Sequence, residues 1–92
     1  MAVLSDAEIQ QSLTQLPEWR LERGELVRDF SFGDFREAMS FVNSVAALAE
    51  RAGHHPDIDI RYNKVRLALS SHDAGGITVR DLKLAGDVGS LL

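Results

Sequence analysis

The three histidines of this chain are its clearest candidates for chemistry. His54 and His55 are adjacent, and His72 follows later in the sequence. An imidazole has an unperturbed pKa of about 6.5, so near neutral pH its protonated form can donate a proton and its neutral form can accept one. These residue types therefore indicate general acid–base catalysis.

A predicted β-hairpin lies between the histidine pair and His72, and it must position them. Residues 57–62 and 65–71 alternate between apolar and polar side chains, as half-buried strands do. Asn63 and Lys64 are predicted to form the turn, because asparagine tolerates the left-handed backbone that a two-residue turn needs. The predicted cross-strand pairs are Tyr62 with Val65, Ile60 with Leu67 and Ile58 with Leu69 on the apolar face, and the like-charged Arg61 with Arg66 on the other.

The same register brings the histidines to one end of the hairpin. Continued past the strands, it places His55 opposite His72 and His54 one residue further out. Pro56 cannot donate a backbone hydrogen bond, so the register locates the cluster without fixing its geometry. We therefore expect three imidazoles to gather at the open end of this hairpin.

Other interpretations of these residues are open. Adjacent histidines at a helix-to-strand junction often cap a helix or lie on the surface, but this does not explain why His72 returns to the same place. Three histidines also suit a catalytic zinc ion, although neighbours such as His54 and His55 often point to opposite sides and no helical His-x-x-x-His pair is present. We expect no metal. Nucleophilic catalysis is disfavoured, because the chain lacks cysteine and its paired Ser70 and Ser71 lack a Gly-x-Ser-x-Gly setting.

Capping boxes and turns divide the rest of the chain into further elements. The predicted elements are a helix from Ser5 to Leu16, strands at 19–22 and 26–32 around a turn at 23–25, a long helix from Asp34 to Gly53, the second hairpin, and a helix from Thr78 to Val88. Hairpins cannot build a purely parallel sheet, so we expect a two-layer α+β fold. In it a four-stranded antiparallel sheet is covered by helices, in the order α-β-β-α-β-β-α.

Several residues of the predicted helices have two interpretations. Asp81 is assigned to the capping box of the last helix, and Glu50 is either a solvated residue or a partner that orients one imidazole. Phe41 and Leu48 lie off the apolar stripe of the long helix, so this helix is either broadly buried or packed against another subunit.

Length and composition limit the classes of function. With 92 residues the chain is one domain, spanning 1–92, and a chain this small often gains stability by oligomerising. The net charge of −4 and the scattered Lys and Arg residues disfavour direct nucleic-acid binding. No apolar run approaches the roughly 20 residues that span a bilayer. The first ten residues do not resemble a signal peptide, so we expect no membrane contact and a cytoplasmic protein.

Together these motifs resemble the signature of the pterin-4a-carbinolamine dehydratase family, over nearly the whole chain. The residues that carry the resemblance are Glu50, His54-His55-Pro56, Tyr62-Asn63-Lys64-Val65, Ser71-His72 and Asp81, with Trp19 and Phe30 to Phe35 outside the signature. The resemblance implies a hydro-lyase that dehydrates 4a-hydroxytetrahydropterin to quinonoid dihydropterin, in the tetrahydrobiopterin recycling that serves aromatic amino acid hydroxylases. It implies no metal or organic cofactor, and a homodimer or homotetramer.

The resemblance also assigns roles to individual residues. It gives His54 and His72 proton-transfer roles, without deciding which is the acid, and it gives His55 a contact with the pterin and a share in catalysis. It also implies contacts with the pterin from Pro56, Asp57, Trp19 and Ser71. The sequence is equally consistent with Trp19 as an aromatic residue of the core. Two departures, Ile58 in place of an aromatic residue and Gly53 in place of an acidic one, can change the pocket wall.

A second function is implied by the same resemblance. Animal relatives also bind a homeodomain transcription factor, and some bacterial relatives resemble Rubisco assembly factors, so a non-catalytic interaction protein is the alternative. The intact histidines favour the enzyme. The sequence alone does not indicate which side chain the pterin carries at C6.

Overall fold

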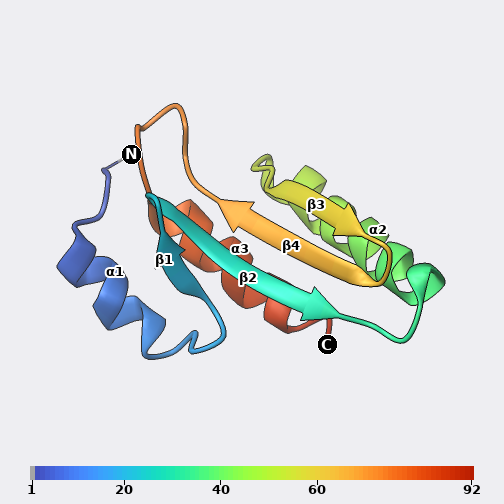
Figure 1. Cartoon of the computed structure of the whole chain (residues 1–92). Helices are drawn as coiled ribbons and strands as arrows, with labels where there is room; N and C mark the ends of the chain where they lie inside the picture. Colours follow the sequence, from blue (N-terminus) through green and yellow to red (C-terminus); the bar gives the residue numbers. More distant parts are fainter. Residues whose placement is uncertain (1) are drawn as a thin grey trace.

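The computed structural model describes residues 2–92 and contains, within them, three helices and four strands in the predicted order (Figure 1). The elements are α1 (Asp6–Leu13), β1 (Arg20–Glu22), β2 (Glu25–Ser31), α2 (Phe35–Ala52), β3 (Asp57–Arg61), β4 (Lys64–Leu69) and α3 (Val79–Gly89). The strands form one antiparallel sheet in the order β1-β2-β4-β3. No helix in this range is long and apolar enough to cross a membrane.

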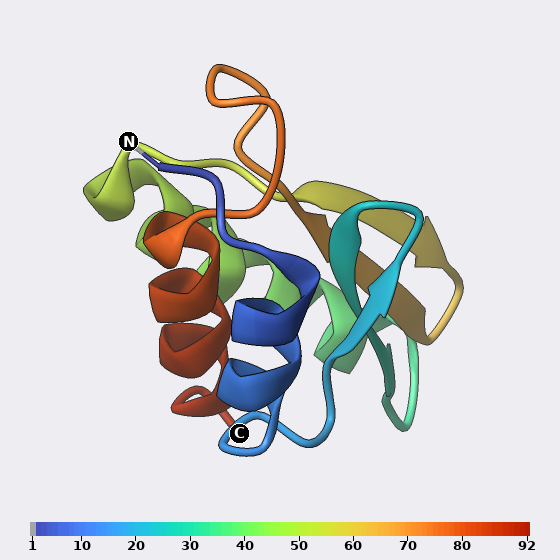
Figure 2. The ribbon, with the colours of Figure 1, turned by 90° about the vertical axis from the view of Figure 1, so that its left-hand side faces the viewer.

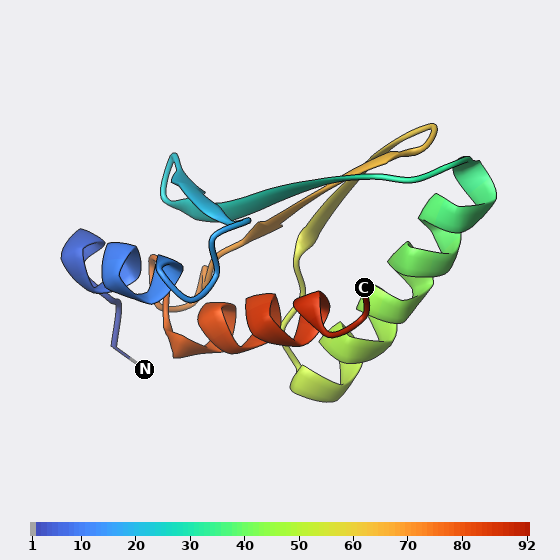
Figure 3. The same cartoon turned by 90° about the horizontal axis from the view of Figure 1, so that it is seen from below.

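The three helices cover one face of the sheet and leave the other face open (Figures 2 and 3). The hydrophobic core lies between these two layers, because every second side chain of β2 and β4 points toward the helices. The most buried apolar side chains of the core are Leu26, Val45, Val65, Leu67, Leu69, Leu84 and Val88. The predicted two-layer α+β fold is therefore confirmed.

Helix starts follow the predicted capping motifs. Ser5 and Glu8 form a capping box before α1, and Asp34 accepts a hydrogen bond from the backbone N–H of Glu37 before α2. The helix α2 ends where predicted, at Gly53, whose φ of 62° is the left-handed conformation that favours glycine.

The first helix is shorter than predicted. It ends at Leu13, and the backbone N–H groups of residues 14–16 bond to carbonyls three residues earlier, which is a tight turn rather than α-helix. Pro17 explains the difference, because a proline disfavours helical backbone at the residue before it. Leu16 therefore packs against the core from this turn.

The register predicted for the second hairpin is wrong by two residues. Tyr62 and Asn63 form the turn, and Arg61 pairs with Lys64 at its base. Tyr62, not asparagine, takes the left-handed backbone, with φ of 53°. Asn63 instead forms two hydrogen bonds with Phe32. Its side-chain Nδ2 donates to the Phe32 carbonyl at 2.7 Å, and its own backbone carbonyl accepts from the Phe32 N–H at 2.9 Å. These two bonds attach the turn to the segment after β2.

A shift of two residues keeps every side chain on its predicted face but changes its partner. Asp59, rather than Arg61, lies opposite Arg66, so the predicted arginine pair does not form. The ladder also ends at Asp57, so the predicted pairing of His55 with His72 is wrong. The positions of the histidines depend instead on the loops that follow α2 and β4.

The off-stripe aromatic residue of α2 belongs to the core. Phe41 is 7% exposed, and its ring centroid lies 4.6 Å from that of Phe30 and 5.0 Å from that of Phe32. Leu48 is only partly buried and packs at the margin of the core. The broadly buried interpretation of this helix therefore holds for Phe41.

We predict that Asn63→Ala lowers the free energy of unfolding by about 1 kcal/mol, because it removes the hydrogen bond to the Phe32 carbonyl. Urea denaturation measures this change. Tyr62→Gly is the matched control in the same turn. It removes an exposed side chain from a left-handed position, so it should leave stability equal or higher. An Asn63→Ala protein as stable as wild type would contradict this explanation of the register.

Candidate active site

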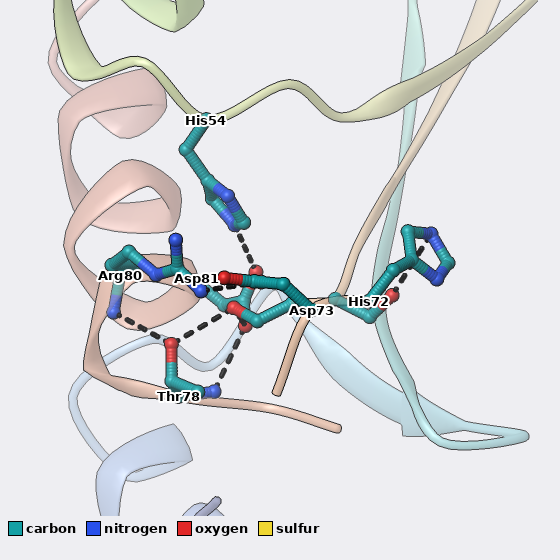
Figure 4. Close-up of polar contacts among 8 residues, drawn as sticks. His54, His72, Asp73, Thr78, Arg80 and Asp81 are labelled. Atoms are coloured by element: carbon teal, nitrogen blue, oxygen red, sulfur yellow. Dashed lines mark hydrogen bonds and ion pairs between the residues drawn. The ribbon is translucent and has the colours of Figure 1, made fainter. Parts of the chain in front are cut away.

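The end of α2 fixes the position of His54. After the left-handed Gly53, the backbone N–H of His54 donates to the carbonyl of Ala49 at 3.2 Å, which closes the helix in a Schellman-type turn. The side chain of His54 then points inward and is only 8% exposed. Its Nε2 lies 2.5 Å from Oδ1 of Asp81 on α3 (Figure 4).

Asp81 is a fully buried carboxylate that joins three parts of the chain. Its side chain has 0% exposure. Oδ2 accepts from the backbone N–H of Thr78 and from Oγ of Ser71, each at 2.9 Å, while Oδ1 faces His54. An ionised carboxylate only accepts hydrogen bonds, so a hydrogen bond from His54 to it requires the proton on Nε2.

The capping role predicted for Asp81 is confirmed, but its contacts with His54 and Ser71 are not visible in the sequence. His54 lies 27 residues before Asp81. The Thr-x-x-Asp capping motif already accounts for an acidic residue at position 81, so the local sequence gave no reason to expect that Asp81 also contacts His54 and Ser71. The family signature does include Asp81, and this was the one feature of the sequence that pointed to a role beyond capping.

Ser71 supports the site from inside the protein. Its side chain is fully buried, and its hydroxyl donates to Asp81. The hydroxyl of Thr78 lies 2.9 Å away and donates to Ser71, since the proton of Ser71 is already used. The predicted contact of Ser71 with a pterin stays a prediction.

His72 lies on the exposed side of this network, in the loop between β4 and α3. Its ring points away from Asp81 (Figure 4), and its Nε2 is 3.5 Å from Oγ of Ser70. The next residue, Asp73, binds Arg80 at 2.7 Å, and this hydrogen bond holds the pKa of Asp73 below its usual value. Asp73 is therefore ionised at neutral pH and cannot serve there as a proton donor.

The third histidine, His55, is exposed and has an exposed partner. Its Nε2 lies 2.5 Å from Oε2 of Glu50, and the two side chains are 62% and 76% exposed. Of the two interpretations of Glu50, a solvated residue or a partner that orients an imidazole, the structure supports the second. Pro56, half-buried, and Asp57, exposed, follow His55 at the start of β3.

The three imidazoles have separate partners, and within residues 2–92 no hydrogen bond joins two of them. The same residues contain no group of three or more His, Cys, Asp or Glu side chains placed to hold a metal ion. The arrangement that the structure offers is one buried imidazole on a carboxylate and two exposed imidazoles on flanking loops. It is suited to moving protons.

Trp19 is not among these groups. It is 3% exposed and packs edge-on against Phe30, with ring centroids 6.5 Å apart. Its indole N–H is buried and finds no acceptor in the described part of the chain. The structure places Trp19 in the core, and the hollow beside it is lined by no histidine. Its predicted contact with a ligand stays a prediction.

A hollow of about 490 Å³ adjoins the buried histidine between α2 and α3. It is lined by Leu48, Arg51, Ala52, His54, Arg80, Lys83, Leu84 and Asp87. A second hollow of about 490 Å³ lies on the sheet, lined by charged residues and no histidine. The first hollow is thus the one that touches a candidate catalytic group.

Comparisons with known proteins point to one family. The family model described as pterin 4 alpha carbinolamine dehydratase matches residues 2–91. A relative from Chloroflexus aurantiacus is 55% identical, with 100% of this chain and 99% of the relative covered. Another from Acidobacterium capsulatum is 56% identical, with 100% of both chains covered. Both carry the name "Putative pterin-4-alpha-carbinolamine dehydratase".

Two solved structures are also similar. The transcriptional coactivator/pterin dehydratase from Brucella melitensis has a TM-score of 0.92 and 31% identity, with 97% of each chain covered. A pterin dehydratase-like protein identified as a RuBisCO assembly factor in the alpha-carboxysome has a TM-score of 0.67 and 27% identity. There 80% of this chain and 88% of the other are covered.

We predict that Asp81→Asn lowers the free energy of unfolding by about 2–4 kcal/mol. The side-chain NH2 of asparagine is a donor, so it would face at least one of the three buried donors that now bond to the Asp81 carboxylate, and that hydrogen bond would be lost. Glu50→Gln is the matched control at the other carboxylate–histidine pair. That pair is exposed and screened, so its loss should change stability by less than about 0.5 kcal/mol. Equal effects of the two substitutions in urea denaturation would contradict the buried network.

Proposed function

This chain belongs to the pterin-4a-carbinolamine dehydratase family, and we propose that it removes water from a 4a-hydroxytetrahydropterin by histidine acid–base catalysis. The observation that supports this proposal best is the buried contact between His54 and Asp81 beside exposed His72. The product is the quinonoid dihydropterin. No organic cofactor takes part in the proposed reaction.

The reaction needs one proton donor and one proton acceptor. The bond between C4a and the hydroxyl oxygen breaks, and a proton from the acid converts the departing hydroxyl into water. A base removes the proton from N5, and the electron pair of that N–H bond forms the double bond between N5 and C4a. Because N5 and C4a are adjacent, the acid at the C4a hydroxyl and the base at N5 must act close together.

His54 can serve as one of these two groups because its orientation is fixed. Asp81 accepts a hydrogen bond from the N–H at Nε2, which leaves Nδ1 as the ring nitrogen that can exchange a proton with a ligand. The carboxylate also stabilises the imidazolium that forms when Nδ1 takes up a proton. Figure 4 shows this ring held against Asp81 from above.

His72 is the proposed second group. It is exposed, and within residues 2–92 its ring makes one hydrogen bond, the long approach to Ser70, so the ring can turn toward a bound ligand. His55, Pro56 and Asp57 lie on the segment that follows His54, where we propose that they contact the pterin. We leave the assignment of acid and base between His54 and His72 open.

The wider role follows from this chemistry as a proposal. A 4a-hydroxytetrahydropterin is the product of aromatic amino acid hydroxylases, so we propose that the enzyme works beside one in the cytoplasm and returns the pterin to recycling. We further propose a homodimer or homotetramer, which the mass from size-exclusion chromatography with light scattering would test.

The alternative, an interaction protein without catalysis, is less well supported. The relative identified as an assembly factor is 27% identical to this chain, whereas two relatives that carry the dehydratase name are 55% and 56% identical over 99% and 100% of their length. The chain also retains all three histidines, and the contact of His54 with Asp81 supports the proposed proton transfer.

The direct test is the rate at which a 4a-carbinolamine, generated by phenylalanine hydroxylase during turnover, loses water. We expect wild type to accelerate this dehydration, and His54→Ala or His72→Ala each to reduce the acceleration about 10²–10⁴-fold, the usual contribution of a general acid or base. Arg61→Ala, on the open sheet face, is the control and should retain full activity.

The outcomes separate the two candidate functions. Circular dichroism of each variant checks that it is folded, and His72→Ala is the safer variant because its side chain is exposed. A wild-type chain that leaves the rate at its uncatalysed value would refute the enzyme. Full activity in a folded His72→Ala variant would refute the assigned role of His72.

A further inference from the structure

The wall of the hollow beside His54 holds more cations than carboxylates. Three of its lining residues are cations, namely Arg51 at the end of α2 and Arg80 and Lys83 on α3, whereas Asp87 is its one carboxylate. The chain as a whole has a net charge of −4. Positive charge is therefore concentrated at a site where the average composition would predict the opposite sign.

These cations are only partly neutralised. Arg80 binds Asp73 at 2.7 Å, and Lys83 binds Asp87 at 3.0 Å. The second pair is largely exposed, so water screens it and it holds Lys83 weakly. Arg51 forms no ion pair or side-chain hydrogen bond with any residue in the range 2–92. An excess of positive charge remains around the opening.

The hollow on the open sheet face provides a comparison. It contains three cations, of which Arg66 and Arg61 each have a carboxylate close by, whereas Nζ of Lys64 lies 3.4 Å from Oγ of Ser31. Arg66 lies 2.8 Å from Asp29, and this hydrogen bond holds the pKa of Asp29 below its usual value. Arg61 lies 3.4 Å from Asp59. The lining of that hollow therefore holds two carboxylates against three cations, whereas the lining beside His54 holds one carboxylate against three cations.

The hollow beside His54 also has an apolar part and a suitable size. Leu48 and Leu84 line it together with Ala52. Its volume of about 490 Å³ lies within the range of about 300–1,000 Å³ that is usual for small-molecule sites. It can therefore hold a chain of several carbon atoms that ends in a charged group.

The chemistry of the ring brings the C6 substituent to this place. In a tetrahydropterin C6 is bonded to N5, and N5 is bonded to C4a. A residue that exchanges a proton at N5 or at the C4a hydroxyl therefore lies beside whatever C6 carries. His54 lines the hollow, so a substituent that leaves C6 next to His54 has the space between α2 and α3 within reach.

On the basis of the proposed function, we propose that this hollow binds an anionic group on the C6 side chain of the substrate, a phosphate monoester or a carboxylate. Arg51 supplies the unpaired guanidinium, and Lys83 turns from Asp87 toward the ligand. Arg80 connects this hollow to the catalytic loop, because its guanidinium also holds Asp73, the neighbour of His72 (Figure 4).

The test compares three stable, fully oxidised pterins by isothermal titration calorimetry at low salt. Neopterin carries a neutral C6 side chain, neopterin 3′-monophosphate carries a phosphate, and pteroylglutamate carries carboxylates. We expect wild type to bind at least one of the two anionic ligands about tenfold or more tightly than neopterin, through charge-assisted hydrogen bonds. This preference should decrease as salt is added.

Two double variants locate the effect. Arg51→Gln with Lys83→Gln should remove the preference, and both side chains are exposed, so the fold should survive. Arg61→Gln with Lys64→Gln removes the same charge from the open sheet face and should keep the preference. The anionic ligand that is preferred identifies the chemistry as phosphate or carboxylate.

Failure of this inference differs from failure of the proposed function. Equal affinity of wild type for the three ligands, or binding of none, would overturn the anion site, and so would a preference that survives in the Arg51→Gln, Lys83→Gln protein. The dehydration assay with a neutral substrate tests the catalytic proposal separately. A chain that accelerates dehydration but shows no preference for anions would keep the enzyme and lose this site.

Discussion

The buried carboxylate of Asp81 is the constraint on which the site depends. A carboxylate without access to water must receive hydrogen bonds from the protein, because an unpaired buried charge costs several kcal/mol. Its donors come from the cap of α3, from Ser71 after β4 and from His54 after α2. Satisfying this one side chain therefore fixes three segments that are distant in the sequence.

This arrangement separates a buried centre from an exposed rim. His54 and Ser71 are buried around Asp81, whereas His55 and His72 are exposed on loops that start beside it. A rigid centre fixes the direction of one proton transfer, and exposed loops leave space for a ligand to enter. The basic hollow between α2 and α3 shares His54 with this centre, so recognition of a side chain and proton transfer can be coupled at one residue.

Local patterns predicted most of the fold, and long-range contacts explain what they missed. The capping motifs and the alternation of β3 and β4 gave the elements and the face of each strand, because both signals lie within a few residues. Alternation repeats every two residues, and the predicted and observed registers differ by two residues, so alternation could not distinguish them. The hydrogen bonds of Asn63 to Phe32 determine the observed register. The contact of His54 with Asp81 likewise joins two ends that no local pattern connects.

The proposed chemistry depends most directly on the contact of Asp81 with His54, which holds the proton of His54 on Nε2 and leaves Nδ1 for catalysis. Long-range ¹H–¹⁵N NMR correlation on ¹⁵N-labelled protein measures this tautomer directly, at a pH where the ring is neutral. We predict that neutral His54 carries its proton on Nε2, with an unprotonated Nδ1. A neutral ring with its proton on Nδ1 would contradict the claim, because Nε2 would then have no proton to donate to Asp81.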